Sequence, residues 1–120
     1  MQPGSVRRGD VYRLDLTRAG GRLSKIRPVV VVQNNIGNRY GQETIVAAIR
    51  DPHGGRILPI FVPLKRGIGG IEKDSVIDAG HLATVSQEAL TIKLGSLPAV
   101  VMEKVDQALA VSLGLLKGVP

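Results

Sequence analysis

The sequence predicts a small antiparallel β-barrel with one C-terminal amphipathic helix, a mainly β fold of the α+β class. Short β-branched and aliphatic runs recur through the first two thirds of the chain, separated by clusters of glycine, proline and asparagine. The last third changes to a period of three and four residues, which is typical of a helix. A length of 120 residues suits one hydrophobic core, so we expect residues 1–120 to form a single domain.

The first two strands are expected on either side of a glycine-containing loop. The run from Val11 to Leu16 follows Gly9 and Asp10 and ends before Ala19-Gly20-Gly21. The run from Pro28 to Val32 is too apolar for an exposed strand, so we expect it to be central and buried on both faces. Proline lacks the N–H group that a sheet requires, so Pro28 is expected at the first residue of that strand.

Three further strands are predicted from the same signals. Thr44 to Ile49 forms an antiparallel pair with the preceding strand, and residues 34–41, rich in turn-forming asparagine and glycine, form an irregular loop between them. A fourth strand covers Ile57 to Val62 and ends at Pro63. A fifth covers about Ser75 to Asp78, so the barrel has five or six strands.

The predicted helix occupies the segment after Leu97-Pro98. Its apolar positions recur at helical spacing and comprise Val101, Met102, Val105, Ala108, Leu109, Leu113 and Leu116. Ser96 is placed to cap the start, and Gly118 with Pro120 to end the helix.

The positive charge is concentrated in the first half of the chain. The net formal charge is +6, and residues 1–66 hold twelve Lys and Arg against four acids. A segment without acids contains Arg18, Arg22, Lys25 and Arg27. This cluster is either an electrostatic footprint for a phosphate backbone or a solvated basic loop. Only three aromatic residues occur, so any RNA contact depends on arginine and polar groups and not on stacked bases.

Several classes of function are disfavoured by the sequence. There is no cysteine, which removes disulfides, thiolate metal sites and cysteine nucleophiles. No dinucleotide fingerprint, phosphate loop or paired-histidine metal motif occurs, and Gly67 to Gly70 lacks the flanking strand and helix of a phosphate loop. We therefore expect no cofactor and no metal. No apolar run approaches the length of a membrane span, so a cytoplasmic protein without a membrane partner is the default expectation.

Two arginine-containing segments carry a resemblance to a known family. Arg8 to Tyr12 at the first strand, followed by Arg27 to Asn34, resembles the opening signature of the MazF/PemK toxins. Further similar segments follow in order at Asn38-Arg39, Ile45 to Ile49, Leu58-Pro59, Asp74 to Val76, Leu94-Gly95 and Met102 to Leu113. The resemblance spans about Arg7 to Leu116.

The resemblance implies a fold shared with the gyrase-poisoning toxin CcdB, a symmetric homodimer and a cognate antitoxin partner. It also implies metal-independent cleavage of single-stranded RNA at short sequence motifs. In such cleavage the ribose 2′-hydroxyl attacks the adjacent phosphorus, so the enzyme must move protons and stabilise a phosphorane. On the basis of this resemblance, we expect the chain to be an endoribonuclease toxin.

Two arginines are the candidate catalytic residues. Arg27 matches the family arginine assigned to this chemistry, and we expect its guanidinium to stabilise the phosphorane. An alternative is a structural salt bridge from Arg27 to Asp10 or Asp15. Arg50 occupies the position where the family has a catalytic threonine or serine. It can add positive charge at the phosphate, but it cannot serve as a general base because its guanidinium stays protonated.

The remaining candidate residues are two histidines, a threonine and the basic loop. His53 and His81 are the candidates for proton transfer, although a solvated side chain is the simpler interpretation of each. His81 replaces a family glutamine that contacts RNA, so an RNA contact is expected for it before catalysis. Thr84 matches a family polar residue beside the groove. The segment from Arg18 to Lys25 differs from the family loop and is expected to cover the RNA.

Two alternatives to an active nuclease remain open. The replacement at Arg50 is compatible with a catalytically weak homologue that binds RNA or an acidic antitoxin segment without cleaving. A gyrase poison on the same fold is a further possibility that no motif supports. Cleavage specificity does not transfer, because the loop and the positions around His81 differ from the family pattern.

Overall fold

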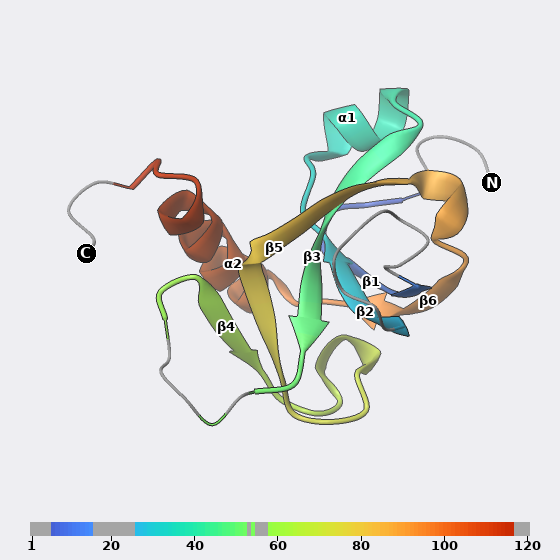
Figure 1. The fold of residues 1–120 in the computed structure, drawn as a ribbon. Coiled ribbons are helices and arrows are strands. Elements are labelled where there is room, and N and C mark those ends of the chain that lie inside the picture. The colour runs from blue at the N-terminus through green and yellow to red at the C-terminus, as the bar shows by residue number, and fades with distance from the viewer. Residues whose placement is uncertain (1–5, 16–25, 53, 55–57, 117–120) are drawn as a thin grey trace.

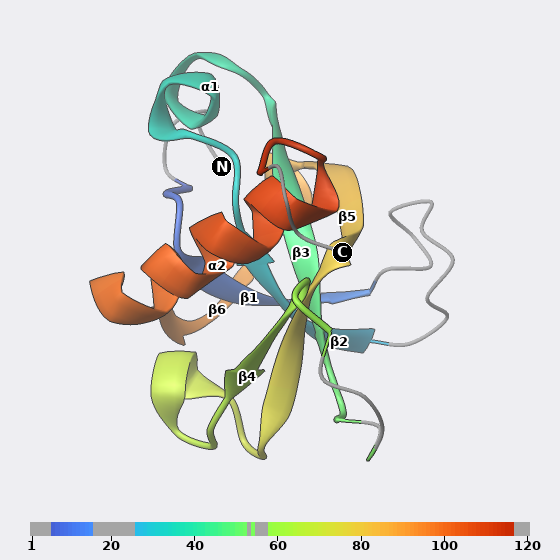
Figure 2. The ribbon, with the colours of Figure 1, turned by 90° about the vertical axis from the view of Figure 1, so that its left-hand side faces the viewer.

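The computed structural model of the chain describes residues 6–15, 26–52, 54 and 58–116. Within these residues the elements are β1 (Asp10–Asp15), β2 (Ile26–Val31), α1 (Asn35–Tyr40), β3 (Glu43–Arg50), β4 (Phe61–Leu64), the 3₁₀ helix η1 (Ile68–Gly70), β5 (Ser75–Ser86), the 3₁₀ helix η2 (Gln87–Ala89), β6 (Ile92–Ser96) and α2 (Ala99–Ser112). The strands form one antiparallel sheet in the order β4-β5-β3-β2-β1-β6. The sheet curls, and α2 lies across one face (Figures 1 and 2). The predicted fold class is confirmed.

The strand β2 separates two apolar layers, as its β-branched run predicts. Val30 packs into the layer that α2 closes with Val105 and Ala108. Val29 and Val31 face the other layer, inside the curl of the sheet. All three valines have no exposed surface, so the central position of this strand is confirmed.

The start of β2 differs from the prediction. The strand begins at Ile26, so Pro28 is its third residue and lies opposite Arg13 of β1. Two residues before the proline therefore extend the strand toward the basic loop. This extension places Arg27 within the sheet.

The segment after β2 forms a helical turn in place of the expected irregular loop. The Asn34 side chain accepts a hydrogen bond from the Gly37 amide at the start of α1. Asn38 is fully buried, and its Oδ1 accepts hydrogen bonds from Thr44 at 2.6 Å and Gln33 at 3.0 Å. These side-chain bonds satisfy polar groups inside the turn and explain why an asparagine-rich segment is ordered.

The fourth and fifth strands depart most from the expectation. Pro63 lies inside β4 and does not end it, which is tolerated because β4 is an edge strand. The fifth strand continues far beyond Asp78 to Ser86. Its pairing with β3 shifts by three residues between Asp78 and Leu82, which bulges the strand there. The strand pairs with β4 over Ser75–Asp78 and with β3 on both sides of the bulge.

The end of the described chain corrects both predicted helix boundaries. Ser96 belongs to β6, which the sequence did not indicate, and its hydroxyl donates to Asp10 on β1 at 3.1 Å. The N-cap of α2 is Pro98, and the helix ends at Ser112, before Gly114 adopts a left-handed φ of 73°. Of the helices in the described residues, none has the length and apolar character needed to cross a membrane.

Candidate functional site

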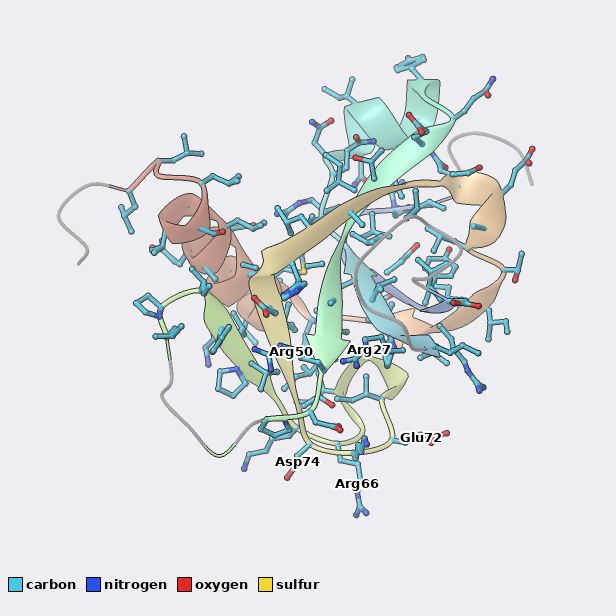
Figure 3. All side chains as sticks on the ribbon, viewed as in Figure 1. Arg27, Arg50, Arg66, Glu72 and Asp74 are labelled. Atoms are coloured by element: carbon cyan, nitrogen blue, oxygen red, sulfur yellow. The ribbon has the colours of Figure 1, made fainter. Side chains whose placement is uncertain are left out.

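A cavity of about 350 Å³ lies where β2 begins and β3 ends. Its lining includes both candidate catalytic arginines, Arg27 and Arg50, together with Arg13, Ile26, Pro28, Ile49, Asp51, Ser75, Leu94 and the segment from Gly70 to Lys73. Figure 3 shows Arg27 and Arg50 beside the end of β3, with Glu72 on the loop below them. The structure thus brings together the two residues to which the sequence assigned the chemistry.

The strand register explains why the two arginines meet. Val29 of β2 lies opposite Ala48 of β3, and the neighbouring pairs keep this antiparallel register. Two residues further toward the cavity, the same register places Arg27 opposite Arg50. Side chains that are opposite each other lie on one face of a sheet. Two positive charges are therefore adjacent at this edge.

Arg27 presents a guanidinium that the protein does not fully satisfy. Its Nε is buried and has no hydrogen-bond partner among the described residues. Asp10, one of the two acids considered for a structural salt bridge to Arg27, pairs with Lys93 at 3.3 Å in the described part of the chain. A buried donor without a partner costs free energy, and an anionic oxygen from a ligand would relieve that cost.

Arg50 is held by a buried carboxylate that sequence reasoning missed. Its Nε donates to Asp78 Oδ2 at 3.0 Å, and the Asp78 side chain is only 4% exposed. The same oxygen lies 2.9 Å from His81 Nδ1, within hydrogen-bond distance. The Gly80 amide donates to Oδ1 at 2.8 Å. Asp78 thereby joins Arg50 and His81 into one hydrogen-bonded group, which we call the Asp78 cluster.

The charge state of the cluster follows from these contacts. Burial acts to raise the pKa of the Asp78 carboxyl group. The hydrogen bonds from His81, the Gly80 amide and Arg50, together with the Arg50 charge, act in the opposite direction and lower this pKa overall. Asp78 is therefore ionised at neutral pH and can only accept hydrogen bonds.

The Arg50 guanidinium is also packed against an aromatic ring. It lies 4.9 Å from the centre of the Phe61 ring, a cation–π contact, and its Nη1 donates to the Asp51 carbonyl oxygen at 3.4 Å. Its side chain is 14% exposed. Arg50 is thus a fixed positive charge at the wall of the cavity and not a mobile surface side chain.

Thr84 lies at a second, larger cavity. This cavity has a volume of about 860 Å³, and its lining includes Thr84, Ser86 and Glu43. Arg13 and Ile26 line both cavities, so the two adjoin each other at the start of β2. His81 lines neither cavity and reaches the first only through Asp78 and Arg50.

The other predicted residues are not placed by the structure. Arg18, Arg22, Lys25 and His53 lie outside the described residues. The sequence also gave no reason to single out Phe61. For Asp78 a weak signal existed, since it is a charged residue at the end of the apolar run Val76-Ile77. Within the described segments, no three His, Asp or Glu side chains gather in a way that could hold a metal ion.

Comparison with known proteins agrees with the fold. Residues 7–113 match the family described as PemK-like, MazF-like toxin of type II toxin-antitoxin system. The chain is 42% identical over 112 residues to endoribonuclease EndoA of Bacillus subtilis, which covers 92% of this chain and 97% of that protein. It is 40% identical over 111 residues to endoribonuclease MazF of Staphylococcus epidermidis, covering 92% of each.

A solved structure has the same fold. This structure is an endoribonuclease in complex with its cognate antitoxin from a mycobacterial species, and it matches with a TM-score of 0.79 at 25% identity. The match covers 95% of this chain and all of that one. With the family match over most of the sequence and two relatives at 40% identity or more, the chain belongs to the PemK/MazF family of type II toxin–antitoxin toxins.

Proposed function

We propose that residues 1–120 form one endoribonuclease toxin domain that cleaves single-stranded RNA by attack of the ribose 2′-hydroxyl, without a metal ion. The observation that carries this proposal is the convergence of Arg27 and Arg50 on one cavity. The names of the relatives support the choice of reaction, because EndoA and MazF are both endoribonucleases.

The two arginines have different parts in this proposal. The unpartnered Nε of Arg27 and its neighbouring N–H groups bind the non-bridging oxygens of the scissile phosphate as negative charge builds up there. Arg50, fixed by Asp78 and Phe61, adds a second positive charge to the same phosphate. Neither guanidinium accepts a proton, so each acts through its charge and its hydrogen bonds.

The remaining contacts extend the RNA site beyond the cavity. Thr84 lines the adjoining larger cavity and contacts a flanking nucleotide. Arg18, Arg22 and Lys25 provide positive charge to the phosphate backbone, and His81 contacts the RNA beside Arg50. Such backbone contacts supply affinity without sequence discrimination.

The protein partners follow from the family. We propose a homodimer and a cognate antitoxin that occupies the basic groove and competes with RNA. The solved relative bound to its antitoxin supports this partner. An acidic segment with apolar anchors would complement the positive first half of the chain. The site of action is the cytoplasm, where messenger RNA is available.

The proposal is tested by incubating the protein with a long single-stranded RNA in EDTA and mapping the ends. We expect cuts at a repeated short motif that leave a cyclic phosphate and a free 5′-hydroxyl. The Arg27→Ala variant is expected to cut at least about 100-fold more slowly, because the removal of one donor that stabilises transition-state charge costs about that much in rate. Arg27→Lys keeps the charge without the planar fork and serves as the matched control for geometry.

One observation favours a second candidate function. Arg50 is committed to Asp78 and Phe61 and supplies no hydroxyl group at its position. A protein that binds RNA or antitoxin without cleaving would result if no other group moved the protons. Intact RNA that is still retained by the wild-type protein in a binding assay is the outcome that would establish this function instead.

A further inference from the structure

The bond between His81 and Asp78 determines which ring nitrogen of His81 is available. An ionised carboxylate only accepts hydrogen bonds, so the Nδ1 of His81 must carry the proton that Asp78 Oδ2 receives at 2.9 Å. In the neutral ring the Nε2 then holds a free lone pair. The side chain of His81 is 49% exposed, whereas Asp78 behind it is only 4% exposed. The ring is therefore anchored at one nitrogen and accessible from solvent.

The Asp78 cluster places this histidine beside the proposed phosphate site. Arg50 Nε and His81 Nδ1 both contact Asp78 Oδ2, at 3.0 and 2.9 Å. The distance between the two nitrogens therefore cannot exceed the sum of these two distances. Arg27 follows on the other side of Arg50 through the strand register. His81 of β5 is thus joined through Asp78 to Arg50 of β3, and Arg50 neighbours Arg27 of β2.

The reaction requires a base that neither arginine can supply. Two carboxylates, Asp51 and Glu72, line the cavity. Imidazole exchanges protons in the physiological range and is the commonest general base in enzymes.

We propose that His81 is a catalytic residue whose Nε2 takes the proton of the attacking ribose 2′-hydroxyl, and that Asp78 is the positioning residue that orients the ring. This inference rests on the proposed endoribonuclease function and names a group that performs its proton transfer. It also gives Asp78 a double task, because the same oxygen holds the arginine and the base at a fixed spacing.

The step balances as follows. The 2′-oxygen bonds to phosphorus as its proton passes to His81 Nε2, and the bond from phosphorus to the 5′-oxygen breaks with the electron pair remaining on that oxygen. Water protonates the 5′-oxygen, and the hydroxide formed is neutralised by the proton that His81 returns to solvent. The products are a 2′,3′-cyclic phosphate and a 5′-hydroxyl.

The test is chemical rescue in single-turnover cleavage of a short RNA that contains one mapped site, in EDTA. We expect His81→Ala to cut at least about 100-fold more slowly, which is the usual size of a general-base contribution. Free imidazole added to His81→Ala is expected to restore cleavage in a concentration-dependent and saturable way. His81→Gln, which can still donate to Asp78 but cannot accept a proton in this range, is expected to stay slow with or without imidazole.

Two further measurements separate catalysis from binding and folding. Affinity is measured with the same RNA carrying a 2′-deoxy nucleotide at the cleavage site, and both variants are expected to bind it within a few-fold of wild type. Thermal unfolding checks that they fold. His53→Ala is measured in parallel, since His53 is the only other histidine in the chain.

The outcomes distinguish this inference from the proposed function. A wild-type protein that leaves RNA intact overturns both. A wild-type protein that cuts, with His81→Ala equally fast, overturns the role of His81 alone. The role of His81 is also overturned if imidazole does not rescue His81→Ala and the loss of cleavage rate is matched by a loss of RNA affinity. It is likewise overturned if imidazole rescues His53→Ala instead.

Discussion

The carboxylate of Asp78 holds both Arg50 and His81 in place. Its side chain is 4% exposed and receives hydrogen bonds from a guanidinium, an imidazole and a backbone amide. A buried charge with several partners is stable only while those partners remain, and removing one member leaves the others uncompensated. The arrangement of Arg50 and His81 is therefore tied to the ionisation of one side chain.

The pH dependence of stability should report this ionisation. The pKa of Asp78 is lower in the folded protein than its ordinary value of 3.8, so the stabilisation is present above pH 3.8 and is lost as pH falls through the folded pKa. At neutral pH we expect Asp78→Asn to lower the free energy of unfolding by about 3 kcal/mol. The gap between wild type and variant is expected to shrink below pH 3.8 in urea titrations.

Asp74 provides the matched control for this experiment. It is exposed, and its Oδ1 accepts a hydrogen bond from the Arg66 amide at 2.9 Å. Asp74→Asn should change the free energy of unfolding by less than about 1 kcal/mol. A wild-type to Asp78→Asn gap that stays constant from neutral to acidic pH would contradict the assigned role of Asp78.

The residues of the site were only partly predictable. Arg27 and Arg50 could be named because they belong to segments with a recognisable pattern. Asp78 could not be linked to Arg50, because their contact depends on a pairing register that shifts by three residues at the bulge in β5. The hydrophobic pattern specifies register only where it is regular, and the bulge interrupts it here.

At the scale of elements, the turn η1 is pressed against β6 through glycines. A Cβ atom at Gly70 would lie 2.0 Å from the carbonyl oxygen of Leu94, and one at Gly95 would lie 2.7 Å from the backbone of Gly69. Backbone can approach backbone here only because side chains are missing. This contact brings the loop that carries Glu72 to the rim of the first cavity.

Two alanine substitutions separate backbone conformation from backbone contact. Gly67 and Gly70 both have a left-handed φ, of 93° and 82°, but a Cβ at Gly67 would meet no atom within 4 Å. We expect Gly67→Ala to cost about 1–2 kcal/mol of unfolding free energy from conformation alone. Gly70→Ala is expected to cost on the order of 4 kcal/mol or more, because a rigid carbonyl must move. Equal costs in denaturant titrations would show that the contact is unimportant.

Elements with strong local signals were predicted, and those fixed by distant contacts were not. The buried valines of β2 indicate a central strand, and the apolar period indicates α2. The strand β6 escaped prediction because Ile92–Ser96 contains lysine, glycine and serine and pairs with a strand far away in sequence. The continuation of β5 was missed because its bulge changes which alternate residues face the core: Ile77 and Leu82 pack into the same layer.

At the scale of the whole molecule, apolar side chains remain exposed after α2. Leu113, Leu115 and Leu116 are 58%, 74% and 42% exposed. Their clustering at the end of one helix is the pattern of an association surface. We expect light scattering to give the mass of two chains, and Leu113→Glu/Leu115→Glu to shift the equilibrium toward one chain on dilution.

Ile36 on α1 supplies a control for this experiment, because it is 76% exposed in a different element. Ile36→Glu should leave the mass unchanged. A mass of one chain at all concentrations would contradict the proposed homodimer. If Ile36→Glu dissociates the dimer and the leucine variant does not, the dimer interface lies at α1.

The order of the strands has a consequence for how the protein is made. The first strand, β1, pairs with the last, β6, with Asp10 opposite Ser96, and one apolar layer includes Val105 and Ala108 of α2. A ribosome releases the chain from its N-terminus, so the nascent protein holds an incomplete sheet with unpaired edges until almost its whole length has emerged. We expect RNA cleavage to require that β6 and α2 have been synthesised, because the sheet and one of its apolar layers are incomplete without them.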